Sequence, residues 1–159
     1  SSDPIYFQDA VCQATTGYVI VGIATTIDII GSLNGVFYTD ATTSKPTFQN
    51  YLQSGNTATD IKALVNDNPL QQYEIRADNT GTAVQGDIGK VADIVYAAGS
   101  SPNYVSGAML DDSDIAAGAS KQLKIVGLSR DPDNRDLTAA GVVWRVVINE
   151  SFFLDDSGI

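Results

Sequence analysis

Alternation of apolar and polar residues is the clearest pattern in the chain. From Gln72 to Asp78, apolar residues such as Tyr73 and Ile75 share one face, and polar or charged residues share the other. From Val142 to Ile148 the alternation recurs around Trp144, with further valines on the second face. A period of two is typical of a half-buried β-strand, so both segments are predicted strands.

Four other segments are also predicted strands. Lys121 to Leu128 is one, and Val19 to Ile23, a continuous β-branched run, is predicted to be buried on both faces. Asn34 to Thr39 contains aromatic strand formers and opens on Asn34-Gly35, which is a turn signal. Asp60 to Val65 has a helix-start signal, but its alternation favours a strand.

Helical signals are confined to short segments. Asp87 to Val91 predicts one helical turn before a strand from Ala92 to Tyr96, and Asp114 to Ala117 predicts another turn. Breaks rich in Gly, Pro, Asn, Asp and Ser separate the strands at short intervals. The predicted fold class is all-β: a single antiparallel β-barrel or sandwich domain with one or two short helical turns.

The 159 residues fit one domain, and no repeat or linker divides them. Residues 1–30 are expected to form an N-terminal arm and the first strand or strands. Residues 31–159 are expected to form the barrel or sandwich body, within one domain overall.

Charge narrows the choice of partners. Acidic residues outnumber basic ones by 19 to 9, for a net charge of −10. Such a chain repels nucleic acid and anionic membranes, and no apolar run approaches a membrane span, so neither partner is expected. The charge suits a protein that faces solvent on a crowded assembly. Ordinary acidic solubility explains it equally well.

Side chains for catalysis are scarce. Histidine is absent, which removes Ser-His-Asp and Cys-His chemistry. Asp156-Ser157-Gly158 matches the aspartic-protease triplet but has no partner triplet. Cys12, the single cysteine, cannot form an internal disulfide and is predicted to be a small core residue. We therefore predict no enzyme, no catalytic residues and no cofactor.

Two acidic clusters are candidate calcium loops. Asp131 to Asp136 gathers oxygen ligands but misses the EF-hand spacing, and Asp111 to Asp114 is the second cluster. Solvated loops are the expected state of both, so no metal site is predicted. The glycosylation sequon Asn149-Glu150-Ser151 is interpreted as chance. Some of the aromatic residues could form a sugar platform, although most are expected in the core.

Four blocks in order resemble a known group of virion proteins. The blocks are Gly35 to Asp40 with Pro46 to Tyr51; Asp60 to Asp78; Asp87 to Ile94; and Gln122 to Leu128 with Val142 to Phe152. The set resembles small head decoration, or cement, proteins of tailed bacteriophages, often marine or aquatic ones. It covers most of the chain from about Gly35 onward and contains no catalytic motif.

The resemblance implies a β-barrel-like module that binds the major capsid protein on the outer surface of the virion and stabilises the shell. The acidic charge agrees with this, because the inner capsid face meets packaged DNA. Two alternatives stay open. One is another virion part, such as a tail, neck or fibre-associated β module, and the other is a carbohydrate-binding module.

A cement protein gains affinity from repetition, so a homo-oligomer with closed symmetry, a trimer or a dimer, is expected. Apolar residues near both ends are the candidate contacts. The first segment would be either an arm on a neighbour or a first strand, and the second either core or contact. The candidate contact residues are Ile5, Tyr6, Phe7, Phe152, Phe153 and Leu154.

Overall fold

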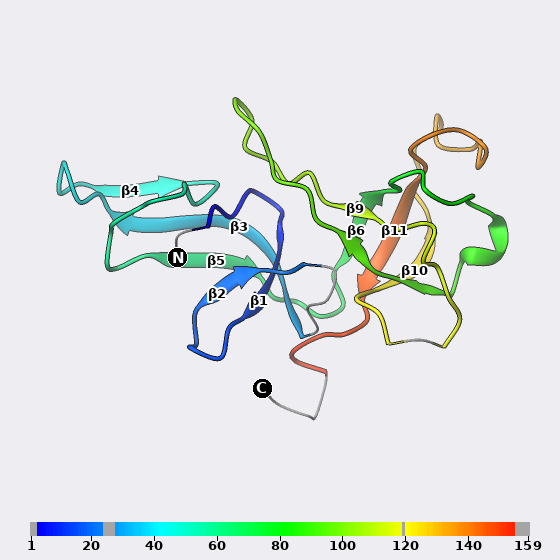
Figure 1. The fold of residues 1–159 in the computed structure, drawn as a ribbon, viewed down its shortest axis with the longest axis horizontal. Helices are drawn as coiled ribbons and strands as arrows, with labels where there is room; N and C mark the ends of the chain where they lie inside the picture. The colour runs from blue at the N-terminus through cyan, green and yellow to red at the C-terminus, as the bar shows by residue number, and fades with distance from the viewer. Residues whose placement is uncertain (1–2, 24–27, 119, 155–159) are drawn as a thin grey trace.

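The computed structural model describes residues 3–23, 28–118 and 120–154. Every strand pair within its sheets is antiparallel, which confirms the predicted all-β class. The strands form a five-stranded, a four-stranded and a two-stranded sheet, and no sheet of the described residues closes into a barrel. The fold is therefore sandwich-like, with β3, β4 and β5 at one end and β6, β10 and β11 at the other (Figure 1).

The five-stranded sheet, here the first sheet, is built around one long strand. Its strands are β1 (Ala10–Gln13), β2 (Val19–Val21), β3 (Ile29–Thr39), β4 (Pro46–Gln49) and β5 (Lys62–Asn66). Strand β5 pairs with one edge of β3, and β1 and β4 share the other edge. The strand at Asn34 to Thr39 is confirmed and extends five residues further toward the N-terminus. The preference for a strand at Asp60 to Val65 is also confirmed.

The turn predicted at Asn34-Gly35 is wrong. The dipeptide lies inside β3, where the register with β5 passes from Leu33 opposite Val65 to Gly35 opposite Leu64. Asn34 is therefore the extra residue of a β-bulge. Gly35 has a φ of +153°, a conformation that side chains other than glycine rarely adopt. An Asn-Gly pair tolerates such angles in a bulge as well as in a hairpin, and pairing on both edges of β3 selects the bulge.

The four-stranded sheet, here the second sheet, has the order β6-β11-β10-β7. It contains β6 (Gln72–Arg76), β7 (Val91–Ala92), β10 (Leu123–Leu128) and β11 (Val143–Ile148). These confirm the three strands predicted from Gln72, Lys121 and Val142. The small third sheet pairs β8 (Ile94–Val95) with β9 (Met109–Leu110).

Three local predictions need correction. The helical turn lies at η1 (Gln85–Asp87), ahead of the predicted position, and the strand after it is divided between β7 and β8. Residues 114–117 form no helical turn, because Ala116 bridges Val91 in an extended conformation. The strand at Val19 is confirmed, but its burial on both faces is wrong, since Ile20 is 39% exposed.

Two apolar clusters hold the sheets together. The larger one surrounds Trp144 and the smaller one surrounds Leu33, and both of these side chains are fully buried. Ile29 of β3 packs in the larger cluster, so the central strand of the first sheet contributes to both. Its backbone also accepts a hydrogen bond from the Phe152 amide at 3.1 Å. The two sheets are thus linked through β3, which packs in both clusters.

Candidate functional site

The N-terminal candidates Ile5, Tyr6 and Phe7 lie on the protein's own body. Ile5 pairs with Leu52 through hydrogen bonds in both directions, of 3.1 and 2.7 Å, and is 2% exposed. The Phe7 amide donates to the Tyr104 carbonyl at 3.0 Å. This segment makes isolated bridges to Leu52 and Val105 and forms no strand of its own. Ile5 is a core residue here, while Tyr6 and Phe7 are half-buried.

The C-terminal candidates divide differently. Phe152 is half-buried beside β3, whereas Phe153 and Leu154 are 49% and 63% exposed. The rings of Phe152 and Phe153 meet edge to face, with centroids 5.3 Å apart. Phe153 and Leu154 are therefore open to a partner. The triplet at Asp156 lies outside the described residues.

Sequence reasoning missed a larger apolar surface on the first sheet. Phe37 of β3 pairs directly with Phe48 of β4, and Leu64 of β5 pairs with Gly35. Their exposed fractions are 43% for Phe37, 59% for Phe48 and 45% for Leu64. These three residues are called the outer apolar face below. Apolar residues gathered on one sheet face are typical of an interaction surface.

The bulge in β3 creates this face. Before it, Leu33 points into the core; after it, Val36 and Tyr38 do so, which sends Phe37 outward. Gly35 then lies under the Phe48 ring, since a Cβ there would be 2.7 Å from Phe48 Cζ. The signal available in the sequence was the alternation within β5, which marks Leu64 as outward when Ala63 and Val65 are inward.

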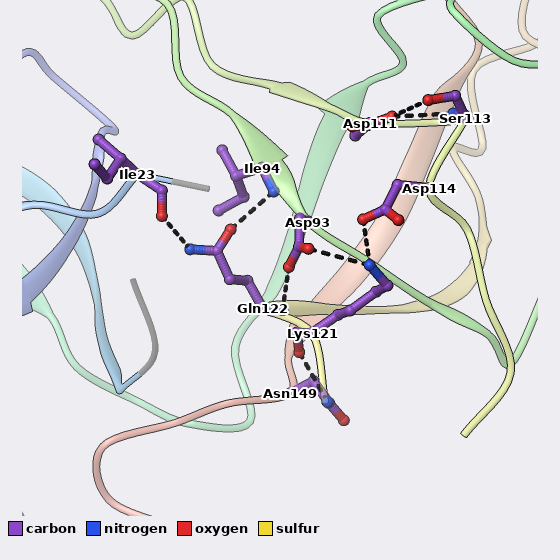
Figure 2. Close-up of polar contacts among 9 residues, drawn as sticks. All are labelled: Ile23, Asp93, Ile94, Asp111, Ser113, Asp114, Lys121, Gln122 and Asn149. Carbon is purple, nitrogen blue, oxygen red and sulfur yellow. Dashed lines mark hydrogen bonds and ion pairs between the residues drawn. The ribbon is translucent and has the colours of Figure 1, made fainter. Parts of the chain in front are cut away.

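The most connected polar cluster surrounds Lys121 (Figure 2). Its Nζ donates to Asp93 Oδ2 at 3.1 Å and to Asp114, and the side chain is 13% exposed. Burial opposes the charge, but the bonds to Asp114 and Asp93 prevail and raise the pKa of Lys121. The bond to Lys121 lowers the pKa of Asp114. The lysine therefore stays protonated, which suits an ion pair and not a nucleophile.

Gln122, next in sequence and just before β10, connects β8 to the segment after β2 (Figure 2). Its buried side chain accepts from the Ile94 amide at 2.8 Å and donates to the Ile23 carbonyl at 2.7 Å. Nearby, Asn149 donates to the Lys121 carbonyl at 2.9 Å, and Ser151 is buried. Asn149 and Ser151 of the sequon therefore take part in contacts within the protein.

The acidic loops are stabilised by their own backbone. Asp111 Oδ1 accepts from the Ser113 amide and hydroxyl, and Asp131 Oδ1 accepts from the Asp133 amide at 3.0 Å. These are the local turns that aspartate favours. Across the described residues, no group of three or more His, Cys, Asp or Glu side chains is arranged to hold a metal ion.

Two buried titratable groups lie in the first sheet and its N-terminal connection. Asp9 is fully buried, and its Oδ2 accepts from the Tyr6 amide at 2.8 Å. Burial raises its pKa, although the Ser106 hydroxyl and the Tyr6 amide act in the opposite direction. Cys12 is 2% exposed, which confirms the predicted core position. Burial, with a smaller contribution from Asp28, raises the pKa of its thiol, so Cys12 is not activated.

A cavity of about 620 Å³ lies between the two sheets. Apolar residues such as Ile29 and Val146 line it together with polar residues such as Gln8 and Ser106. Tyr73 also lines it, and burial raises its pKa. Elsewhere, Tyr51 and Tyr104 stack face to face with centroids 4.1 Å apart. The facing sides of these rings are occupied by each other, which removes them from a sugar platform.

Comparison with known protein families, with characterised proteins and with solved structures found no match to this chain. None of the helical segments in the described residues is long and apolar enough to cross a membrane.

Proposed function

We propose that this protein is a non-enzymatic head decoration protein that binds the outer surface of a bacteriophage capsid and stabilises the shell. The observation that carries the proposal is the outer apolar face, since Phe37, Phe48 and Leu64 are exposed on a well-paired sheet. Exposed apolar side chains gathered on one face of a sheet favour a protein partner. The major capsid protein is the proposed one.

Charge and sequence give further support. The net charge of −10 favours the outside of a DNA-filled shell over the inside. The blocks that resemble cement proteins include Gly35 to Asp40 and Pro46 to Tyr51, which carry Phe37 and Phe48 of the outer apolar face. Many copies, each making a modest contact, would together resist internal pressure.

The copy number in purified particles tests the role. Quantitative peptide mass spectrometry should give a ratio to the major shell protein within a few-fold of one. A ratio far below one would move the protein to the tail or neck. Absence from particles would remove the virion role and leave glycan binding as the hypothesis to test.

A binding experiment tests the surface. Particles lacking the protein are mixed with purified wild-type protein, with Phe48→Ser, and with Leu70→Ser as the control. Leu70 is 76% exposed and lies in the turn before β6, outside the outer apolar face. Only Phe48→Ser should lose binding, by about tenfold or more if Phe48 is a central contact. Equal binding by all three would exclude this face.

A further inference from the structure

Strand β5 is an edge strand whose one protective feature is the exposed Lys62 at its start. In the described residues it pairs only with β3, and its sequence, Lys62 to Asn66, has no proline and no inward charge. The other edges of the first sheet are guarded: β4 begins at Pro46, and β2 has three residues. The side chains of β5 also line an open hollow with Ile30 and Asn34 of β3. Strand β5 therefore offers an edge with no strand paired to it in the described residues, although the Asn66 carbonyl accepts a hydrogen bond of 3.4 Å from the Tyr73 hydroxyl.

From this we infer that two copies of the chain pair through β5, antiparallel and with Leu64 on the two-fold axis, so that their first sheets become one continuous sheet. An acidic protein that associates with itself must do so where its copies do not repel each other. Strand β5 carries one charge, that of Lys62, and no carboxylate. It is suited to a second copy on that ground.

The register makes the pairing self-complementary. With Leu64 opposite its own copy, Lys62 lies opposite Asn66 of the second molecule, so no like charges face each other. Ala63 lies opposite Val65, and both point toward the inner face, where they pack against the small core. The two cores would then adjoin across the new pair, as expected of an isologous interface.

The geometry has a consequence for binding. The two-fold axis of an antiparallel strand pair is perpendicular to the sheet, so both outer apolar faces point to the same side. A dimer would therefore present two copies of the outer apolar face, on which the proposed function rests. Two linked copies bind more tightly than one, even when each copy makes the same contacts as before. The pairing itself does not depend on the virion role, because it is measured on isolated protein.

Sedimentation equilibrium over a wide concentration range is the first test. Wild-type protein should show a monomer–dimer equilibrium. Asn66→Lys places Lys opposite Lys twice and should weaken the dimer by about tenfold, while Asn66→Asp places Asp opposite Lys and should strengthen it at low salt. Far-UV circular dichroism checks that each variant folds. A wild-type monomer at every concentration, or identical dimers from both variants, would overturn the inference.

Cross-linking tests the register. In Leu64→Cys the two new thiols face each other across the axis, so mild oxidation should give a disulfide-linked dimer. Leu70→Cys, at an exposed leucine outside β5, should stay monomeric, and Cys12 is too buried to contribute. A dimer that forms without particle binding would uphold this inference and contradict the decoration role. Particle binding by a strictly monomeric protein would uphold the decoration role and contradict this inference. The β5 edge would then be a candidate contact for the capsid protein.

Discussion

Both main sheets contain a β-bulge followed by a glycine, but a different kind of side chain covers the glycine in each sheet. Strand β3 has a bulge followed by Gly35, and β10 has a bulge followed by Gly127. Each glycine faces outward beneath a side chain of the neighbouring strand. Over Gly35 lies the ring of Phe48, and over Gly127 lies the guanidinium of Arg145. Arg145 Nε also donates to the Leu128 carbonyl at 2.8 Å, which leaves the Nη end of the guanidinium over the glycine.

The difference shows which sheet has an outer face that is suited to contact with water. The outer face of the second sheet carries Gln72, Glu74 and Lys124, and the charge of Arg145 meets solvent. The outer face of the first sheet carries Phe48, which is 59% exposed, and the other members of the outer apolar face. A polar face can stay in contact with water without a cost in free energy. An apolar face, by contrast, lowers the free energy of the system when a partner covers it. The outer face of the first sheet is therefore the side that we propose for binding.

The largest effect is expected in the small core of the first sheet. Leu33→Ala should lower the free energy of unfolding by about 2–5 kcal/mol, because Leu33 is fully buried. Trp144, the single tryptophan, lies in the second sheet, yet its fluorescence should report the same loss, since Ile29 of β3 packs in the cluster around Trp144. Urea unfolding followed by fluorescence and far-UV circular dichroism measures this. Leu70→Ala is the control, with a change within about 0.5 kcal/mol. Separate transitions would mean that the sheets unfold independently.

The two bulge glycines should respond unequally to alanine. Gly35→Ala should cost about 2–3 kcal/mol, because φ is +153° and the new Cβ would lie 2.9 Å from the Gln49 carbonyl oxygen. Gly127→Ala should cost less than about 1 kcal/mol, because the atom it meets is the mobile end of Arg145. Thermal unfolding of both variants compares them directly. An equal loss of stability in both variants would contradict the proposed difference between the side chains that cover the two glycines.

Substitution of Gln122 tests the contribution of its buried hydrogen bonds. Gln122→Met keeps the size of the side chain but leaves the Ile94 amide and the Ile23 carbonyl without this partner, at a cost of about 2 kcal/mol. Gln85→Met, at an exposed position of η1, is the matched control and should be near neutral. Denaturant titration gives both values. If the two variants matched, the hydrogen bonds of the buried amide to β8 and to the segment after β2 would not contribute to stability.

The smallest effect concerns pH and has opposite signs in the two regions. Burial raises the pKa of Asp9, so its contribution to stability is present at low pH and is lost as the pH rises through the folded-state pKa. Asp9→Asn should therefore stabilise the protein at neutral pH, and the gain should shrink on acidification. The pKa of Asp114 is lowered, so Asp114→Asn should destabilise at neutral pH, and that loss should also shrink. Stability of both variants between about pH 3 and 7 tests the signs.

Much of the fold could be predicted from the sequence, because half-burial of a strand leaves a local record. The alternation at Gln72 to Asp78 and at Val142 to Ile148 was sufficient to locate β6 and β11. Of the candidate contacts, Phe153 and Leu154 are exposed, while Ile5 is buried. The outer apolar face was not predicted, because Phe37 and Phe48 looked like ordinary strand and core aromatics.

The sequence by itself determined the all-β class, the positions of most strands, the acidic charge and the absence of histidine chemistry. Only the tertiary structure decided which way each side chain faces beyond a bulge. One extra residue at Asn34 reverses the alternation and turns Phe37 outward. Alternation is a property of neighbouring residues, but register is set by pairing with distant strands, and no local pattern records it.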